Sequence, residues 1–276
     1  MKIKINLLKK PNKKLRSALY AYSVLSRAKA YCNQQNVDLL VGLSFVNKDL
    51  NYVLDNIDNS RRICTKLISN QKLTKTEEKF VSCSMKLQTT NKEVDLEYFK
   101  IIEKYKEIIP KIENILKEIF TDTSVDLKII FLYQPLVETT KGSAFTNGIL
   151  FSVENKNINE ERFYRLITHE IIHCICDHNK EYQELYSAKK LNIEKLRDSR
   201  RIFNEVFTKT IENVLMYKLK LEKEMFATYR YEGAIYNDLA CKMEDNIRSL
   251  YLKWKRSPKD TFVCFLKKNV EKIVKV

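Results

Sequence analysis

Thr168-His169-Glu170-Ile171-Ile172-His173 places two of the chain's three histidines four residues apart. On an α-helix, residues four apart lie on one face, so both imidazoles can reach a single metal ion. Glu170 lies about 100° around the helix from His169, which puts a carboxylate beside that ion. Such a glutamate can take a proton from water that zinc activates near neutral pH, and later return it. The stretch therefore predicts a helix that carries a catalytic Zn²⁺ site.

A catalytic zinc site needs a third protein ligand and an open position. His178 follows His173 by five residues, about 140° further around the helix, on the side of the apolar isoleucines. A helix-end or core histidine is therefore the better interpretation of His178. Asp177 follows His173 by four residues and lies on the metal side. It is a candidate to hydrogen-bond a ligand histidine from behind, and an ordinary aspartate at a helix end is the alternative.

The stretch 203–212, Phe-Asn-Glu-Val-Phe-Thr-Lys-Thr-Ile-Glu, carries apolar residues at helical spacing. Glu205 and Glu212 are seven residues apart, so they align within about 20° on the opposite face. In isolation this pattern indicates the solvated face of an amphipathic helix. Its position downstream of the two histidines favours this stretch as the source of the third metal ligand.

These two stretches together resemble the gluzincins, zinc metallopeptidases whose third ligand is a glutamate on a second helix. Asn204-Glu205-x-Phe207-x-x-x-x-Glu212 is similar to the N-E-G-F-A-x-x-x-E pattern of their aminopeptidase branch. Val206 stands in place of the usual glycine and Thr208 in place of alanine. The resemblance implies that zinc is held by His169, His173 and Glu205, that Glu170 is the general base and acid, and that Glu212 orients a ligand histidine.

The resemblance also implies a tyrosine that hydrogen-bonds the oxyanion of the tetrahedral intermediate. Within the segment 227–236 we favour Tyr231, with Tyr229 second, although a packing role is the alternative in a chain with 15 tyrosines. In zincins the strand before the metal-binding helix is a sheet edge that binds the substrate backbone. Residues 144–153 are the matching strand candidate, and an ordinary strand and turn is the alternative. The implied substrate-binding residues are Phe145, Thr146, Asn147 and Gly148.

The fold that we expect is α+β and mostly helical. Glycine and proline number only four each, which favours long helices with few tight turns. Residues 127–133 and 144–153 are the strand candidates, and the polar stretch 121–126 separates two regions. We expect a helical N-terminal region at 1–122 and a zincin-like catalytic domain with a small mixed sheet at 123–276. Pro110 lies inside a helical pattern and should kink or split that helix.

Localisation is predicted from what the sequence lacks. Seven scattered cysteines fit free thiols in a reducing compartment better than a disulfide framework. There is no apolar run near 18 residues, and the N-terminus does not have the pattern of a secretory signal peptide. We expect a cytoplasmic protein without a transmembrane segment, and delivery into another cell as an effector is left open.

The expected activity is hydrolysis of a peptide or protein substrate. Residues 144–148 do not match the G-x-M-E-N strand with which aminopeptidases of this clan hold a free amine, so we expect an endopeptidase of narrow specificity. The formal net charge of +15 supports an alternative, a basic nucleic-acid-associated binding protein with a structural or vestigial zinc site. Lysine is accompanied by much asparagine and isoleucine, however, which indicates a general compositional bias.

Overall fold

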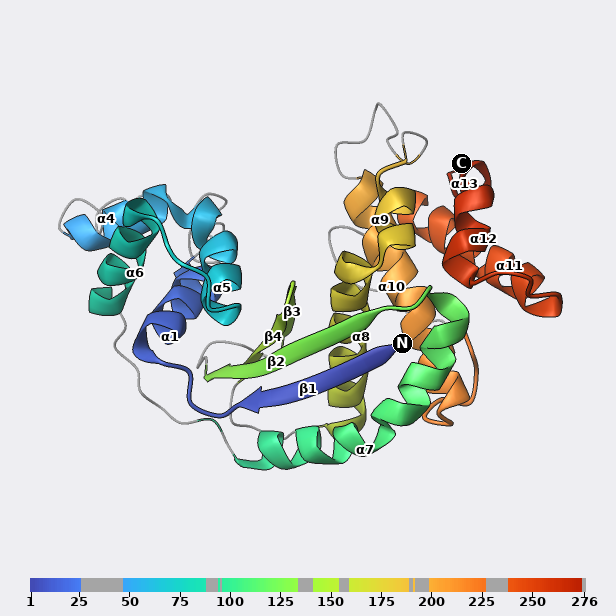
Figure 1. The fold of residues 1–276 in the computed structure, drawn as a ribbon, viewed down its shortest axis with the longest axis horizontal. Helices are drawn as coiled ribbons and strands as arrows, with labels where there is room; N and C mark the ends of the chain where they lie inside the picture. Colours follow the sequence, from blue (N-terminus) through green and yellow to red (C-terminus); the bar gives the residue numbers. More distant parts are fainter. Residues whose placement is uncertain are drawn as a thin grey trace. The chain divides into compact units, whose positions relative to one another are not determined.

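A computed structural model of the chain describes residues 1–25, 47–87, 94, 96–133, 141–153, 159–188, 191, 199–226 and 238–274. These residues are mostly helical and include a small mixed sheet of four strands (Figure 1), which confirms the predicted α+β class. The chain divides into two compact units. Unit 1 comprises Met1–Lys4, Glu103–Val125 and Asn159–Val276, and unit 2 comprises Ile5–Ile102 and Asp126–Ile158. The boundary predicted between 122 and 123 falls inside unit 1.

The sheet has the strand order β1-β2-β4-β3. β2 runs parallel to β4, with Lys128 opposite Gly148, and β3 runs antiparallel to β4, with Ala144 opposite Ile149. All six residues of β4 are buried, as is typical of a strand covered on both faces. β1 lies in a region expected to be helical, and β2 begins within the stretch expected to be a polar break. The strands span Lys2–Leu8 (β1), Ser124–Tyr133 (β2), Lys141–Phe145 (β3) and Gly148–Val153 (β4).

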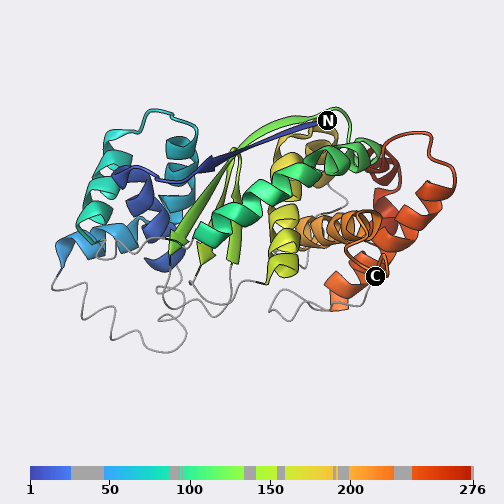
Figure 2. The same cartoon turned by 90° about the horizontal axis from the view of Figure 1, so that it is seen from below.

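Unit 2 packs a group of short helices on the sheet, and Figures 1 and 2 both show α1, α4, α5 and α6 grouped together. Their apolar side chains share one core with Ile130, Leu132 and Leu150 of the sheet. The opposite face of β2 presents Phe131, which contacts Tyr98 with ring centroids 5.5 Å apart. The elements are α1 (Lys13–Tyr20), η1 (Ala21–Leu25), α4 (Lys48–Asp55), η2 (Ile57–Asn59), α5 (Ser60–Ile68), α6 (Lys75–Leu87) and the first part of α7 (Leu96–Ile119).

Local sequence signals explain how several of these helices begin. Thr74 and Glu77 form a reciprocal capping box, in which the Thr74 N–H donates to Glu77 Oε2 (2.8 Å) and the Glu77 N–H donates to Thr74 Oγ1 (3.3 Å). α7 is assigned as one helix although Pro110 lies inside it, so the proline does not split the helix.

Unit 1 is built around α8 (Glu160–His178) and α10 (Ser199–Lys218), which pack side by side (Figure 1). Asn159 caps the N-terminus of α8, where its Oδ1 accepts the Arg162 N–H (2.9 Å), a role that asparagine favours. A cluster of aromatic rings joins α10 to its neighbours, with Phe207 stacked on Phe262 and tilted against Tyr182. The other elements are the second part of α7, α9 (Lys180–Tyr186), α11 (Asp238–Arg256), α12 (Phe262–Lys268) and α13 (Val270–Ile273).

The structure also shows the state of the cysteines and the apolar character of the helices among the described residues. All six cysteines among them are thiols, as expected: Cys64, Cys83, Cys174, Cys176, Cys241 and Cys264. In the part of the chain that the structure describes, no helix combines the length and the apolar character that crossing a bilayer requires.

A buried hydrogen bond fixes α8 against α7 one residue before His169. Thr168 Oγ1 donates to the Tyr164 carbonyl (2.8 Å), so the Tyr105 hydroxyl donates to Thr168 Oγ1 (2.8 Å). The rings of Tyr105 and Tyr164 meet edge to face at 5.4 Å. Since Tyr105 is completely buried, this contact fixes the helical turn that carries His169.

Replacing Tyr105 by phenylalanine should lower the free energy of unfolding of unit 1 by about 1 kcal/mol, because one buried hydrogen bond is lost while the ring remains. Trp254 is the sole tryptophan and is buried in unit 1, so its fluorescence during urea denaturation reports this unit. Tyr217→Phe, at a residue 40% exposed on α10, is the control. Equal denaturation midpoints for the two variants would contradict the role of Tyr105.

Candidate metal centre

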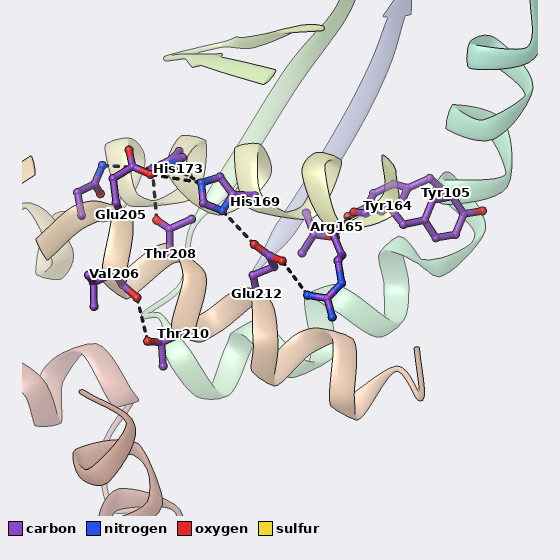
Figure 3. A network of polar contacts seen from close by, with 12 residues as sticks. Tyr105, Tyr164, Arg165, His169, His173, Glu205, Val206, Thr208, Thr210 and Glu212 are labelled. Carbon is purple, nitrogen blue, oxygen red and sulfur yellow. Dashed lines mark hydrogen bonds and ion pairs between the residues drawn. The ribbon is translucent and has the colours of Figure 1, made fainter. Parts of the chain in front are cut away.

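Three side chains from α8 and α10 bring their ligand atoms together. His169 and His173 lie one turn apart on α8, and their Nε2 atoms are 3.1 Å apart. Glu205 projects from α10, and its Oε2 is 3.5 Å from each Nε2 (Figure 3). Among the described residues, this is the group of histidine, cysteine and acidic side chains whose spacing could hold a metal ion.

The triangle formed by these atoms has the size that a tetrahedral metal ion requires. Tetrahedral coordination with metal–ligand bonds of about 2 Å separates neighbouring ligand atoms by about 3.3–3.5 Å. The observed edges of 3.1, 3.5 and 3.5 Å are close to this separation. Two imidazole nitrogens and one carboxylate oxygen also leave a coordination position open, which is the arrangement of a catalytic site.

Accessibility differs across the three ligands. The side chain of His169 is 7% exposed, whereas that of Glu205 is 38% exposed. Glu170, the next residue after His169 on α8, is 7% exposed. The ligand set is therefore reachable from solvent at Glu205, while His169 is held in the interior.

The pKa values of His169 and Glu205 show how strongly the three side chains interact. Burial lowers the pKa of His169, but the hydrogen bonds with Glu205 and Glu212 outweigh burial and raise it to about 10. Burial raises the pKa of Glu205, but hydrogen bonds from His169 and His173 hold that pKa well below its usual range. The two imidazoles and the Glu205 carboxylate therefore interact strongly, and a cation bound between them would stabilise the same carboxylate.

Three charged side chains form a series of contacts on the Nδ1 side of His169. Its Nδ1 is 3.0 Å from Oε2 of Glu212, as the family resemblance implied for this glutamate. Arg165 Nη1 donates to the other oxygen of Glu212, Oε1 (3.2 Å), and Arg165 Nη2 donates to Glu222 Oε1. Glu212 therefore contacts a metal ligand with one oxygen and a cation with the other.

His173 is supported by neutral groups. Its Nδ1 lies 3.2 Å from Asn204 Nδ2 and 3.3 Å from Thr208 Oγ1, both on α10. The buried hydroxyl of Tyr182 donates to Asn204 Oδ1 (2.6 Å). When Nε2 of His173 is a ligand, Nδ1 carries the proton and donates to Thr208 Oγ1, because Asn204 Nδ2 is itself a donor and cannot accept it.

Sequence reasoning missed Tyr182 and four further supporting residues. Asn204 and Thr208 flank Glu205 at positions that reach α8, and Arg165 precedes His169 by four residues, so helical spacing contained a signal for these three. The fourth, Glu222, lies after the end of α10, and no local pattern points to it.

The other predicted residues lie elsewhere. Asp177 and His178 are exposed at the end of α8, and the His173 Nδ1 contacts come from α10 rather than from Asp177. Tyr229 and Tyr231 lie outside the described residues.

The predicted substrate segment belongs to unit 2, whereas the candidate metal-binding residues belong to unit 1. Phe145 ends β3, Thr146 and Asn147 form the turn, and Gly148 begins β4. The strand directly before α8 was expected to be the sheet edge, but β4 lies between β2 and β3, and the edge strands are β1 and β3. The hairpin between β3 and β4 places β3, the earlier strand, at the edge of the sheet. A sequence pattern predicts that a segment is a strand, but not its position in the sheet. The substrate role of these four residues stays a prediction.

Comparison with known proteins adds no further assignment. No protein-family model, curated protein or solved structure matches the chain. The candidate centre therefore rests on its own residues and their geometry.

Glu205→Ala should weaken metal binding by about 100-fold or more, because two histidines alone make an incomplete site. Zinc content per chain, measured by elemental analysis after dialysis against a weak chelator, should be about one for the wild type and near zero for the variant. Glu161→Ala, an exposed glutamate on α8, is the matched control and should retain zinc. Full zinc content in Glu205→Ala would show that the third ligand is another residue.

Proposed function

We propose that this chain is a zinc-dependent metallopeptidase of the gluzincin type. The observation that carries the proposal is the triangle of His169 Nε2, His173 Nε2 and Glu205 Oε2, with edges of 3.1–3.5 Å. A structural zinc site uses four protein ligands, whereas this site offers three and has Glu170 adjacent to a ligand. The small mixed sheet and the two ligand-bearing helices support a zincin-like catalytic fold.

The donor set favours zinc among the common metal ions. Two imidazoles with one carboxylate suit zinc in a tetrahedral site, whereas calcium and magnesium prefer sites made of oxygen ligands. Zinc with an open position supplies a Lewis acid that activates water and polarises a carbonyl group. The proposed reaction is hydrolysis of a peptide bond.

Four side chains of this protein have the other roles in the proposed reaction. Glu170 takes the proton of the attacking water and returns it to the leaving amine, a role that its place beside His169 supports. Glu212 and Thr208 hold the two histidines through their Nδ1 atoms, so that both Nε2 atoms keep their directions. The partly exposed side of Glu205 gives a substrate access to the centre.

The substrate class follows from what the sequence lacks. Residues 144–148 do not carry the amine-binding pattern of the aminopeptidase branch, which supports an endopeptidase of narrow specificity. The cysteine thiols among the described residues support a reducing compartment such as the cytoplasm.

Glu170→Gln should retain zinc within about twofold and lower peptide hydrolysis by about 100-fold or more, because the proton acceptor is lost while the ligands remain. A complex peptide library incubated with the zinc-loaded protein and analysed by mass spectrometry for new termini measures hydrolysis without a known substrate. Glu161→Gln is the control on the same helix and should cleave like the wild type. Cleavage by Glu170→Gln at the wild-type rate, or no cleavage by the zinc-loaded wild type, would contradict the proposal.

A second candidate function is favoured by exposed basic residues around the end of α11. Lys253, Lys255, Arg256 and Lys259 are all exposed, in a chain of net charge +15. A nucleic-acid-associated protein should bind DNA or RNA with an affinity that falls steeply with salt and is unchanged by Glu170→Gln. Fluorescence anisotropy with a labelled oligonucleotide at 50 and about 200 mM salt measures this dependence. Absence of binding at the lower salt concentration would exclude the candidate.

A further inference from the structure

The charged chain behind His169 extends two residues beyond the histidine's immediate partner. Glu212 contacts His169 Nδ1 through Oε2 and Arg165 Nη1 through Oε1, and Arg165 Nη2 contacts Glu222 (Figure 3 shows Arg165, Glu212 and His169). Arg165 and His169 lie one turn apart on α8, so both reach the same carboxylate on α10. The side chains of Arg165 and Glu212 are 18% and 9% exposed.

A carboxylate held by one hydrogen bond does not have a fixed direction. The terminal torsion of glutamate is broad, so a single contact between Glu212 and His169 leaves the carboxylate able to rotate. The second contact, from Arg165 to Oε1, restricts that rotation. It also satisfies an anionic oxygen that is nearly removed from water and would otherwise lack compensation.

The guanidinium of Arg165 is itself held by two carboxylates. It presents fixed N–H directions, and it uses Nη1 for Glu212 and Nη2 for Glu222, which follows α10. A lysine would present a single point charge and could not hold both carboxylates with the same geometry. The arrangement therefore needs arginine specifically, beyond a positive charge at this position.

We propose that Arg165 is a positioning residue of the metal centre: anchored by Glu222, it fixes Glu212 and thereby the direction and tautomer of His169. The inference rests on the metal site of the proposed function and not on peptide hydrolysis. A salt bridge that only joins α8 to the end of α10 is the competing explanation. That explanation predicts that replacing Arg165 lowers the free energy of unfolding. It also predicts that any change in zinc affinity does not depend on Glu212.

A double-mutant cycle on zinc affinity separates these explanations. The variants are Arg165→Gln, Glu212→Gln and the two combined, each as the full chain, with zinc affinity measured by competition with a chromophoric chelator. Arg165→Gln should lose about 10-fold and Glu212→Gln about 10- to 100-fold in affinity. The double variant should bind no more weakly than Glu212→Gln, because Arg165 acts through Glu212.

Two further variants serve as a conservative replacement and a control. Arg165→Lys retains charge and most of the stem, and it should still lose affinity because it cannot hold both carboxylates. Arg162→Gln changes an exposed arginine on the same helix and should match the wild type. With cobalt(II) in place of zinc, the visible absorption spectrum should change in Arg165→Gln and Arg165→Lys but not in Arg162→Gln, because it reports the ligand geometry.

The inference is overturned if Arg165→Gln and Arg165→Lys bind zinc within about twofold of the wild type, or if the losses of the two single variants multiply in the double variant. A wild type that binds no metal would overturn both this inference and the proposed function. A wild type that binds zinc without cleaving peptides would refute the peptidase alone, since the cycle measures metal affinity.

Discussion

The packing of α8 against α10 is the constraint on which the candidate site depends. It brings Glu205 within 3.5 Å of two histidine nitrogens that helical spacing has already placed together. α10 is buried along most of its length, yet it carries polar residues on its inner faces. Those residues include Thr208, Lys209, Thr210, Glu212 and Asn213. Burying so many polar groups is unfavourable unless they find partners, and the two histidines of α8 are the partners of Glu212 and Thr208.

The two histidines are held in chemically different ways. Glu212 and Arg165 give His169 an ionic environment, whereas Thr208, Asn204 and Tyr182 give His173 a neutral one. A carboxylate on Nδ1 raises the basicity of an imidazole ligand more than a hydroxyl does. His169 is therefore expected to be the stronger electron donor of the pair, and its placement the more sensitive to charge.

Unit 2 contains the edge strand β3, which ends at Phe145. The edge strand β3 is already engaged within this unit, because Arg61 Nη2 donates to the Ala144 carbonyl (2.6 Å). The same guanidinium lies 5.5 Å from the centroid of the Phe145 ring. A peptide that pairs with β3 at Ala144 would have to displace Arg61, so this contact protects an edge that would otherwise be exposed.

Features set by neighbouring residues were determined by the sequence itself. The spacing of His169 and His173, the capping box at Thr74 and the cap at Asn159 follow from helical periodicity and from hydrogen bonds across a few residues. The alignment of Glu205 with Glu212 could also be predicted, because both lie on one helix. Strand β1 and the separation of α4 from α5 by η2 could not, since pairing and packing decided them.

The tertiary structure decided which residues complete the site. Local spacing offered Asp177 and His178 as well as Glu205, and the packing of α8 on α10 brings only Glu205 to both Nε2 atoms among the described residues. The contact between Arg165 and Glu222 joins residues 57 positions apart, and no periodic pattern encodes such a distance. Periodicity fixes the direction of a side chain from its own helix, whereas its partner depends on how separate segments pack.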